Sequence, residues 1–160
     1  MLWMAFAVAG AVEPQLEVLD GGMVRGKVAV SASADEVRTL VSAPIQLGKL
    51  TSKDSTVTVK PASEAKCRMV TIATPHPIMP VTYTSKDCDT AKGVTSKLVE
   101  SKQLTHFEAE WKVEALGDKA LITYDLDLKT NALVPGFIIR RSTRNAVRDA
   151  LVALEKAFAK

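Results

Sequence analysis

The sequence predicts one α+β domain, in which a curved antiparallel sheet of about seven strands wraps around a long C-terminal helix. Three observations support this fold class. A helix-capping motif follows the first predicted strand, residues 103–130 alternate between apolar and polar side chains over an unusual length, and the end of the chain carries a helical apolar stripe. One or two short helices are expected after the first strand.

The first elements are a strand and a short helix. Residues 23–31 carry valine at alternate positions, as a half-buried strand does. Ser33 and Glu36 then have the spacing of a capping box, in which each side chain accepts a hydrogen bond from a free N–H group at the helix start. The helix is expected to end before Pro44, and residues 45–50 could add another helical turn.

Six further strands are predicted in the middle of the chain. Their expected positions are residues 57–59, 67–73, 81–88, 94–101, 103–115 and 120–130. The alternation is clearest in the last two strands, where Phe107 and Trp111 share one face and Glu108 and Glu110 the other, which is typical of an antiparallel sheet with one face in water. Both strands run for about 11–12 residues against a usual five or six, and such lengths imply strong curvature.

A long helix is predicted over residues 135–159. Pro135 suits the first helical turn, because the N–H group that proline lacks would be unpaired there in any case. Apolar residues then follow at spacings of four, three and four, which gives one stripe facing the sheet. The stripe consists of Val147, Leu151, Leu154 and Phe158.

The composition excludes several classes of protein. With 160 residues, of which 47% are hydrophobic and 24% charged, the chain has the values of one globular domain and not those of a disordered or multi-span membrane protein. A net charge of +3 is too small to indicate nucleic-acid binding. Two cysteines and two histidines do not suggest a zinc site, and neither a nucleophile motif nor a glycine-rich phosphate loop occurs. We therefore assign no catalytic residue, no metal and no cofactor.

The N-terminal segment has two interpretations. Residues 2–12 carry no charge and contain small residues that resemble a signal-peptidase site, which is typical of a signal segment. No basic residue precedes this segment, however, and the alternative is an apolar segment packed on the fold. We divide the chain into an N-terminal extension or possible signal segment, residues 1–22, and one domain, residues 23–160.

Cys67 and Cys88 flank a proline-rich connection between two predicted strands. If this connection is a hairpin loop centred between Pro77 and Ile78, residues whose numbers add to 155 lie opposite each other, and the two cysteines meet this condition. Opposite residues on paired strands have Cβ atoms roughly 4.5–5.5 Å apart, which is close to disulfide reach. A disulfide and a signal segment favour an exported or periplasmic protein, whereas two free thiols fit a cytoplasmic one.

This order of elements resembles the helix-grip fold of the START-like superfamily, and within it the polyketide cyclases and the coenzyme Q-binding START proteins. The resemblance is carried by the first strand with its capped helix (28–41), the paired long strands (103–130) and the segment 133–141 that leads into the last helix. It covers residues 23–160 and depends on element order and strand length, with no catalytic motif. It implies a cavity between sheet and helix that takes a small hydrophobic molecule such as a lipid, sterol, quinone or polyketide.

The apolar face of the predicted sheet supplies candidate ligand-binding residues. Pockets for small apolar ligands have mostly apolar walls with a few polar groups, but an ordinary core has a similar composition, so both interpretations stay open. Tyr83, Trp111 and Tyr124 are the better candidates, because a buried hydroxyl or indole N–H needs a partner. The other candidates are Val57, Val59, Val70, Ile72, Leu98, Phe107, Ile122, Leu126 and Phe137.

The last helix is basic. Residues 135–160 contain six basic and two acidic side chains, a net charge of +4, and Arg140 lies in line with the apolar stripe with Arg144 beside it. These two arginines could orient the carboxylate, phosphate or carbonyl group of a ligand. They could equally extend over the helix end and pair with acidic residues at the sheet rim, or bind an anionic membrane surface.

Three functions remain open from the sequence. The first is a carrier or sensor of a hydrophobic molecule, without catalysis. The second is an enzyme that resembles the polyketide cyclases and uses Tyr83, Tyr124 and Arg140 to transfer protons in the same cavity. The third is a protein that contacts a macromolecule through its basic helix. We expect a monomer or weak dimer, with a small hydrophobic ligand as partner and no nucleic acid.

Overall fold

The computed structural model describes residues 13–75, 80–131 and 133–159. The strands are β1 (Gln15–Val18), β2 (Val24–Val30), β3 (Thr56–Pro61), β4 (Cys67–Thr74), β5 (Val81–Asp89), β6 (Gly93–Ser101), β7 (Leu104–Leu116) and β8 (Lys119–Thr130). The helices are α1 (Ala34–Val41), α2 (Pro44–Thr51) and α3 (Gly136–Ala157), and the 3-10 turn η1 (Asp20–Gly22) joins β1 to β2. The segment with signal-like features, residues 2–12, lies outside the described residues.

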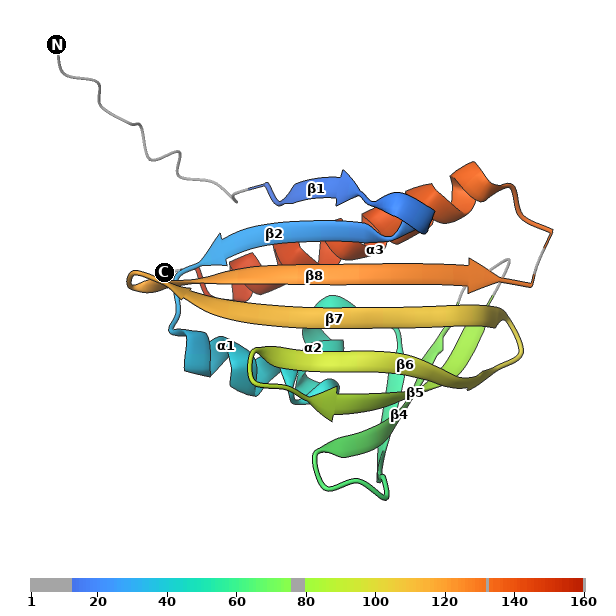
Figure 1. Cartoon of the computed structure of the whole chain (residues 1–160), viewed down its shortest axis with the longest axis horizontal. Helices are drawn as coiled ribbons and strands as arrows, with labels where there is room; N and C mark the ends of the chain where they lie inside the picture. The colour runs from blue at the N-terminus through green and yellow to red at the C-terminus, as the bar shows by residue number, and fades with distance from the viewer. Residues whose placement is uncertain (1–12, 76–79, 132, 160) are drawn as a thin grey trace, which may run out of the picture.

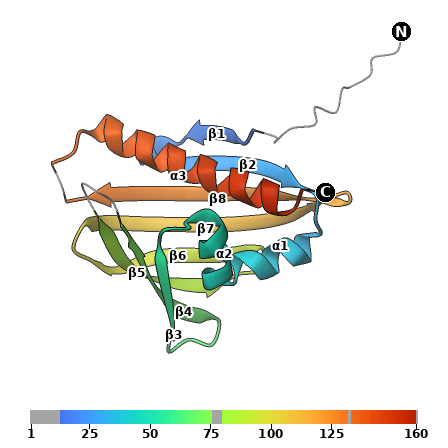
Figure 2. The same ribbon diagram turned by 180° about the vertical axis from the view of Figure 1, so that it is seen from behind.

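All eight strands form one antiparallel sheet in the order β1-β2-β8-β7-β6-β5-β4-β3. The sheet is strongly curved, α3 runs along β2 and β8, and α1 and α2 lie on the same side of the sheet as α3 (Figure 1, Figure 2). The predicted α+β helix-grip class is therefore confirmed. We refer to the side that faces the helices as the concave face and to the opposite side as the convex face.

The sheet has one strand more than expected, because residues 15–18 form β1 and pair with β2. Leu16 lies opposite Gly26 and is half-buried, while the other three residues of β1 are exposed. A four-residue edge strand with one half-buried side chain is too short to show alternation, so the sequence pattern did not reveal it. Part of the N-terminal extension thus belongs to the sheet.

The start of α1 has the predicted capping box. Ser33 Oγ accepts a hydrogen bond from the N–H group of Glu36 at 3.2 Å, and the Glu36 carboxylate accepts one from the N–H group of Ser33 at 3.5 Å. A separate helix, α2, begins at Pro44, so the turn expected over residues 45–50 is longer than predicted. In Figure 2, the two short helices lie in front of part of β6 and β7.

Part of the core lies where α3 packs on β2 and β8. Val147, Leu151 and Leu154 of the predicted stripe are fully buried. Gly26 of β2 lies beneath them, and a Cβ atom at this position would be only 2.6 Å from side-chain atoms of Val147 and Leu151. The missing side chain at Gly26 therefore allows α3 to approach the sheet closely.

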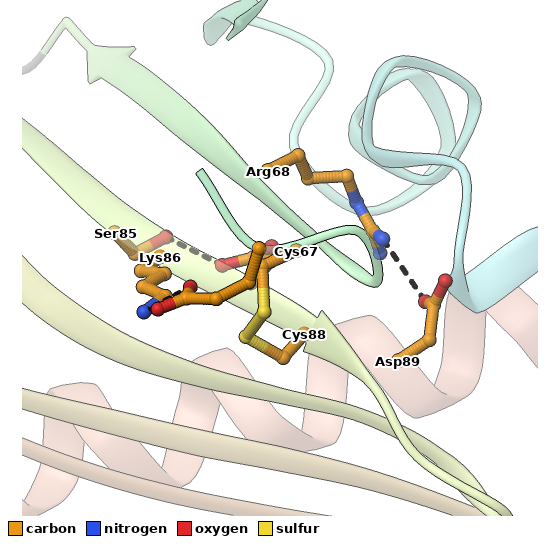
Figure 3. The surroundings of a disulfide bond; sticks show 8 residues. Cys67, Arg68, Ser85, Lys86, Cys88 and Asp89 are labelled. Carbon is orange, nitrogen blue, oxygen red and sulfur yellow. Dashed lines mark hydrogen bonds and ion pairs between the residues drawn. A yellow bond between two sulfur atoms is a disulfide. The ribbon is translucent and has the colours of Figure 1, made fainter. Parts of the chain in front are cut away.

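The register predicted for the β4–β5 hairpin is confirmed, because Cys67 lies opposite Cys88. The structure joins the two residues by a disulfide on the convex face (Figure 3). Glu64 and Lys86 form an ion pair beside it. The disulfide links two neighbouring strands and so prevents β4 and β5 from separating.

Replacing both cysteines by serine is expected to lower the free energy of unfolding by about 2–4 kcal/mol, because the disulfide restricts the unfolded chain. Urea unfolding followed by circular dichroism measures this loss. A thiol reductant added to the wild-type protein should produce a similar loss and should leave the double variant unchanged. If reductant has no effect on the wild-type protein, the two thiols are free in solution.

Candidate functional site

Four aromatic rings from β5, β7 and β8 meet on the concave face. Trp111 and Tyr124 are cross-strand neighbours, and their rings stack with centroids 3.8 Å apart and an interplanar angle of 7°. Tyr83 contacts Phe107, with ring centroids 4.6 Å apart. We call these four residues the aromatic wall. The sequence predicted all four as lining residues of one face, and the structure brings them into two contacting pairs.

The other lining residues predicted in the sheet lie on the same face as the aromatic wall. One cross-strand row contains Val57, Ile72 and Tyr83, a second contains Val59, Val70 and Leu98, and Ile122 and Leu126 flank Tyr124 along β8. Five of the lining residues are buried: Val70, Phe107, Trp111, Ile122 and Leu126. The others keep part of their surface accessible: Val57, Val59, Ile72, Tyr83, Leu98 and Tyr124.

The two tyrosine hydroxyls of the aromatic wall lie deep in the fold. Burial raises the pKa of both Tyr83 and Tyr124, and the charge of Asp87 raises each further. Neither hydroxyl makes a hydrogen bond within the described part of the chain, yet both residues keep some accessible surface. These hydroxyls are thus free to accept or donate a hydrogen bond.

Two pockets formed by described residues lie away from the aromatic wall. The first, of about 160 Å³, is on the convex face over β6, β7 and β8 and includes Lys97 and Glu108. The second, of about 350 Å³, lies between the start of α1 and the β7–β8 turn and includes Asp35 and Lys119. Neither pocket is lined by the residues predicted for ligand binding.

A group of polar side chains also occupies the concave face, and the sequence did not predict it. Ser85 donates a hydrogen bond from its hydroxyl to Asp87 Oδ1 at 2.7 Å (Figure 3). Ser96 stands opposite Asp87 in β6. Burial raises the pKa of Asp87, and the hydroxyl groups of Ser85 and Ser96 and the charge of Arg68 only partly oppose this shift.

Arg68 of β4 lies opposite Asp87 and completes this group. Its Nη1 donates a hydrogen bond to Asp89 Oδ1 at 3.0 Å (Figure 3), whereas its Nε and Nη2 are buried and have no hydrogen-bond partner among the described residues. We call Arg68, Ser85, Asp87, Asp89 and Ser96 the concave polar cluster. The numbers of Arg68 and Asp87 also add to 155, so the hairpin register predicted from the sequence placed these two residues opposite each other.

Asp87→Asn is expected to stabilise the protein at pH 7, by an amount that shrinks as the pH falls towards 3.8. The pKa of Asp87 is raised in the folded state, so the contribution of this residue to stability is most favourable below the ordinary value of 3.8 and is lost as the pH rises through the raised pKa. Asparagine still accepts the hydrogen bond from Ser85 but carries no charge. Thermal unfolding across this pH range measures the difference, with Asp118→Asn in an exposed turn as the control. A variant that is less stable than wild type at pH 7 contradicts the expectation.

The structure places Phe137, Arg140 and Arg144 outside the concave face, on the exposed first turns of α3. Arg140 lies in line with the apolar stripe as predicted, but burial along this line begins only at Thr143, whose hydroxyl donates to the Ile139 carbonyl at 2.8 Å. Neither arginine forms an ion pair with an acidic residue in the described ranges. The expected pairing with the sheet rim is therefore not found there.

Within the described residues, three metal-ligating side chains come within reach of one ion at Glu64, Cys67 and Cys88. The two sulfur atoms are bonded to each other, and the Glu64 carboxylate is paired with Lys86. None of the three groups is available to an ion while the disulfide is intact.

The fold is similar to those of several solved structures, although the sequences differ widely. No family model matches the sequence, and no curated protein matches it. A START superfamily protein from Mycobacterium smegmatis has a TM-score of 0.73 and 19% identity, over 85% of this chain and 96% of that chain. The Zhui aromatase/cyclase from Streptomyces sp. R1128 has a TM-score of 0.60 and 15% identity, over 86% and 95%. A STAR-related lipid transfer protein from Xanthomonas axonopodis has a TM-score of 0.66 and 14% identity, over 93% and 100%.

Proposed function

We propose that this chain, which has the START-like helix-grip fold, binds a small hydrophobic molecule on the concave face and acts as its carrier or sensor. The aromatic wall carries this proposal. Tyr83 and Tyr124 lie deep in the fold, keep accessible surface and have hydroxyls without a described partner. Such side chains border space that their neighbours do not fill, and a mostly apolar wall with a few polar groups suits an apolar guest.

The energy for binding would come from apolar surface. A guest that buries about 250 Å² of apolar surface gains roughly 6 kcal/mol before the cost of immobilisation. The solved neighbours support this kind of function, because they include a protein named for lipid transfer and an aromatase/cyclase. The two pockets described above lie elsewhere, so a guest would approach the concave face where Tyr83 and Tyr124 keep accessible surface.

A cyclase-like enzyme that uses the same face is the second candidate. It is favoured by Asp87, which lies on the same face as Tyr83 and Tyr124. The raised pKa of Asp87 makes its carboxyl group better suited to exchange a proton. Arg140 is too exposed to belong to this set. If Tyr83→Phe and Tyr124→Phe abolish turnover of a polyketide substrate and leave its binding intact, the chain is an enzyme and not only a carrier.

The exposed start of α3 supports a further partner, an anionic membrane surface. Phe137 and Ile138 expose apolar side chains beside Arg140, Arg141 and Arg144, and basic residues next to apolar ones favour binding to anionic lipid. Within the described ranges, the helices are either too short or too polar to span a bilayer. Co-sedimentation with phosphatidylglycerol vesicles, and its loss in Arg140→Glu with Arg144→Glu, tests this contact.

Native mass spectrometry of the purified protein tests the carrier function, because a hydrophobic guest should appear as added mass. A matched pair of variants locates the site. Leu98→Trp fills space on the concave face, and its neighbour Lys97→Trp adds the same side chain on the convex face. We expect a fluorescent apolar probe to bind the Lys97 variant like wild type and the Leu98 variant at least tenfold more weakly. Equal binding by both variants would place the ligand elsewhere.

A further inference from the structure

The disulfide on the convex face contains two potential metal ligands, and a third lies beside them. The sulfur atoms of Cys67 and Cys88 and a carboxylate oxygen of Glu64 all lie within 4.8 Å of one another. While the two sulfur atoms are bonded to each other, neither is a thiolate, which is the form of cysteine that binds a metal ion. This group therefore gains the ability to bind a metal ion only when the disulfide is reduced.

The backbone holds the three residues together without the sulfur–sulfur bond. Cys67 lies opposite Cys88 at one end of the paired strands β4 and β5, and the pairing continues to Thr74 and Val81. The N–H group of Cys67 donates a hydrogen bond to the Glu64 carbonyl at 3.1 Å, which closes the turn before β4. Because reduction leaves these backbone contacts in place, the three ligands stay close together in the reduced protein.

The separations of the three ligand atoms suit a zinc ion. Zinc binds thiolate sulfur at about 2.3 Å and carboxylate oxygen at about 2.0–2.2 Å with tetrahedral angles, so its ligand atoms stand roughly 3.6–3.8 Å apart. The three atoms described here lie within 4.8 Å of one another, so binding requires only small side-chain movements. Two sulfur ligands favour zinc over magnesium and calcium, which prefer oxygen ligands.

Access and charge also favour a metal ion at this position. Glu64 is exposed and both cysteines are partly accessible, so an ion can reach them from solvent. Lys86 pairs with one oxygen of the Glu64 carboxylate, which leaves the second oxygen for the ion. Two thiolates and one carboxylate around Zn²⁺ have a net charge of −1, and the positive charge of Lys86 balances it. A neighbouring positive charge also favours the thiolate form of a reduced cysteine.

We propose that reduction of the Cys67–Cys88 disulfide creates a zinc site, formed by both thiolates and Glu64 with water at the fourth position. A dithiol reductant transfers two electrons and two protons to the disulfide and leaves as its own disulfide. Zinc then displaces both thiol protons and forms two zinc–sulfur bonds and one zinc–oxygen bond. In the reduced protein, the metal ion thus links β4 to β5 as the disulfide does in the oxidised protein.

Zinc affinity of the full chain in its two redox states tests the proposal. The protein is reduced with a phosphine, because a dithiol itself binds zinc, and the affinity is measured at pH 7 by competition with a chromogenic chelator. We expect the reduced protein to bind one zinc ion per chain at least about 100-fold more tightly than the oxidised protein. The oxidised protein is the matched control, since it has the same sequence. Zinc should also raise the urea midpoint of the reduced protein only.

Glu64→Gln tests the third ligand, and Glu100→Gln at another exposed position is its control. We expect Glu64→Gln to weaken zinc binding by about tenfold or more, because an amide is a poorer zinc ligand, and Glu100→Gln to bind zinc like wild type. Cobalt(II) bound in place of zinc should show the thiolate-to-metal absorption in both variants.

Three results would overturn the assignment. They are equal zinc affinity of the oxidised and reduced proteins, unchanged affinity of Glu64→Gln, and one zinc ion shared by two chains in native mass spectrometry. None of these results concerns a guest on the concave face, so the proposed function is tested separately.

Discussion

Gly26→Val is expected to destabilise the protein by about 3 kcal/mol, because the new side chain would occupy the space that α3 fills. A Cβ atom alone would lie 2.6 Å from side-chain atoms of Val147 and Leu151, and 3.0 Å from Leu16. Gly26→Ala should cost less, since these contacts are the ends of side chains that can shift. Urea unfolding measures the series from glycine to alanine to valine.

The adjacent Lys27→Val is the control for this series. Lys27 is exposed and lies on the convex side of the same strand, so the added β-branched side chain meets no helix. If both valine variants have the same stability, α3 does not pack against β2 at the distance described here.

Leu151→Ala is expected to lower the free energy of unfolding by about 3–4 kcal/mol, because it leaves a cavity beneath α3. Leu151 is completely buried and contacts the space above Gly26. Val152→Ala, on a partly accessible side of the same helix, should cost about 1 kcal/mol or less. Urea unfolding of both variants gives the comparison.

A combination of two changes separates packing from helix propensity. In the double variant Gly26→Ala with Leu151→Ala, the new methyl group enters the space that the leucine leaves. The double variant should therefore lose less free energy of unfolding than the sum of the two single-variant losses. Strict additivity would mean that the two residues are not in contact.

The long strands could be predicted from sequence because their pattern has one physical cause. Along the two strands within residues 103–130, successive side chains face the core and water in turn. The alternation of apolar and polar residues therefore follows the burial of the side chains directly. The β4–β5 register could also be predicted from the sequence. The centre of a hairpin loop determines which residues lie opposite each other, and the two cysteines supported one position of this centre. β1 gave no such signal, since it is short and mostly exposed.

The position of Arg140 shows a different limit. Helical spacing gives the angle of a residue around the axis, and by angle Arg140 does follow the buried stripe. It gives no information about how far along the axis the sheet extends, and α3 is exposed almost all round before Thr143. Burial at one end of a helix therefore could not be inferred from its apolar stripe.

The concave polar cluster was missed for a third reason. Polar residues of a two-faced sheet are expected on the wet face, and Arg68 and Asp87 are exceptions to this rule. The predicted β4–β5 register already placed Arg68 opposite Asp87, but not their burial among neighbouring side chains. Ser96 joins the cluster from β6 only in the assembled sheet.

An open sheet has two outer strands with unpaired backbone groups, and here these are β1 and β3. Such edge strands can pair with an edge strand of another molecule and start the growth of a fibre. β1 offers only four residues, and β3 ends in Lys60 and Pro61, a charge and a residue without an N–H donor. Within the described residues, both edge strands are therefore poor templates for pairing with a strand of another molecule.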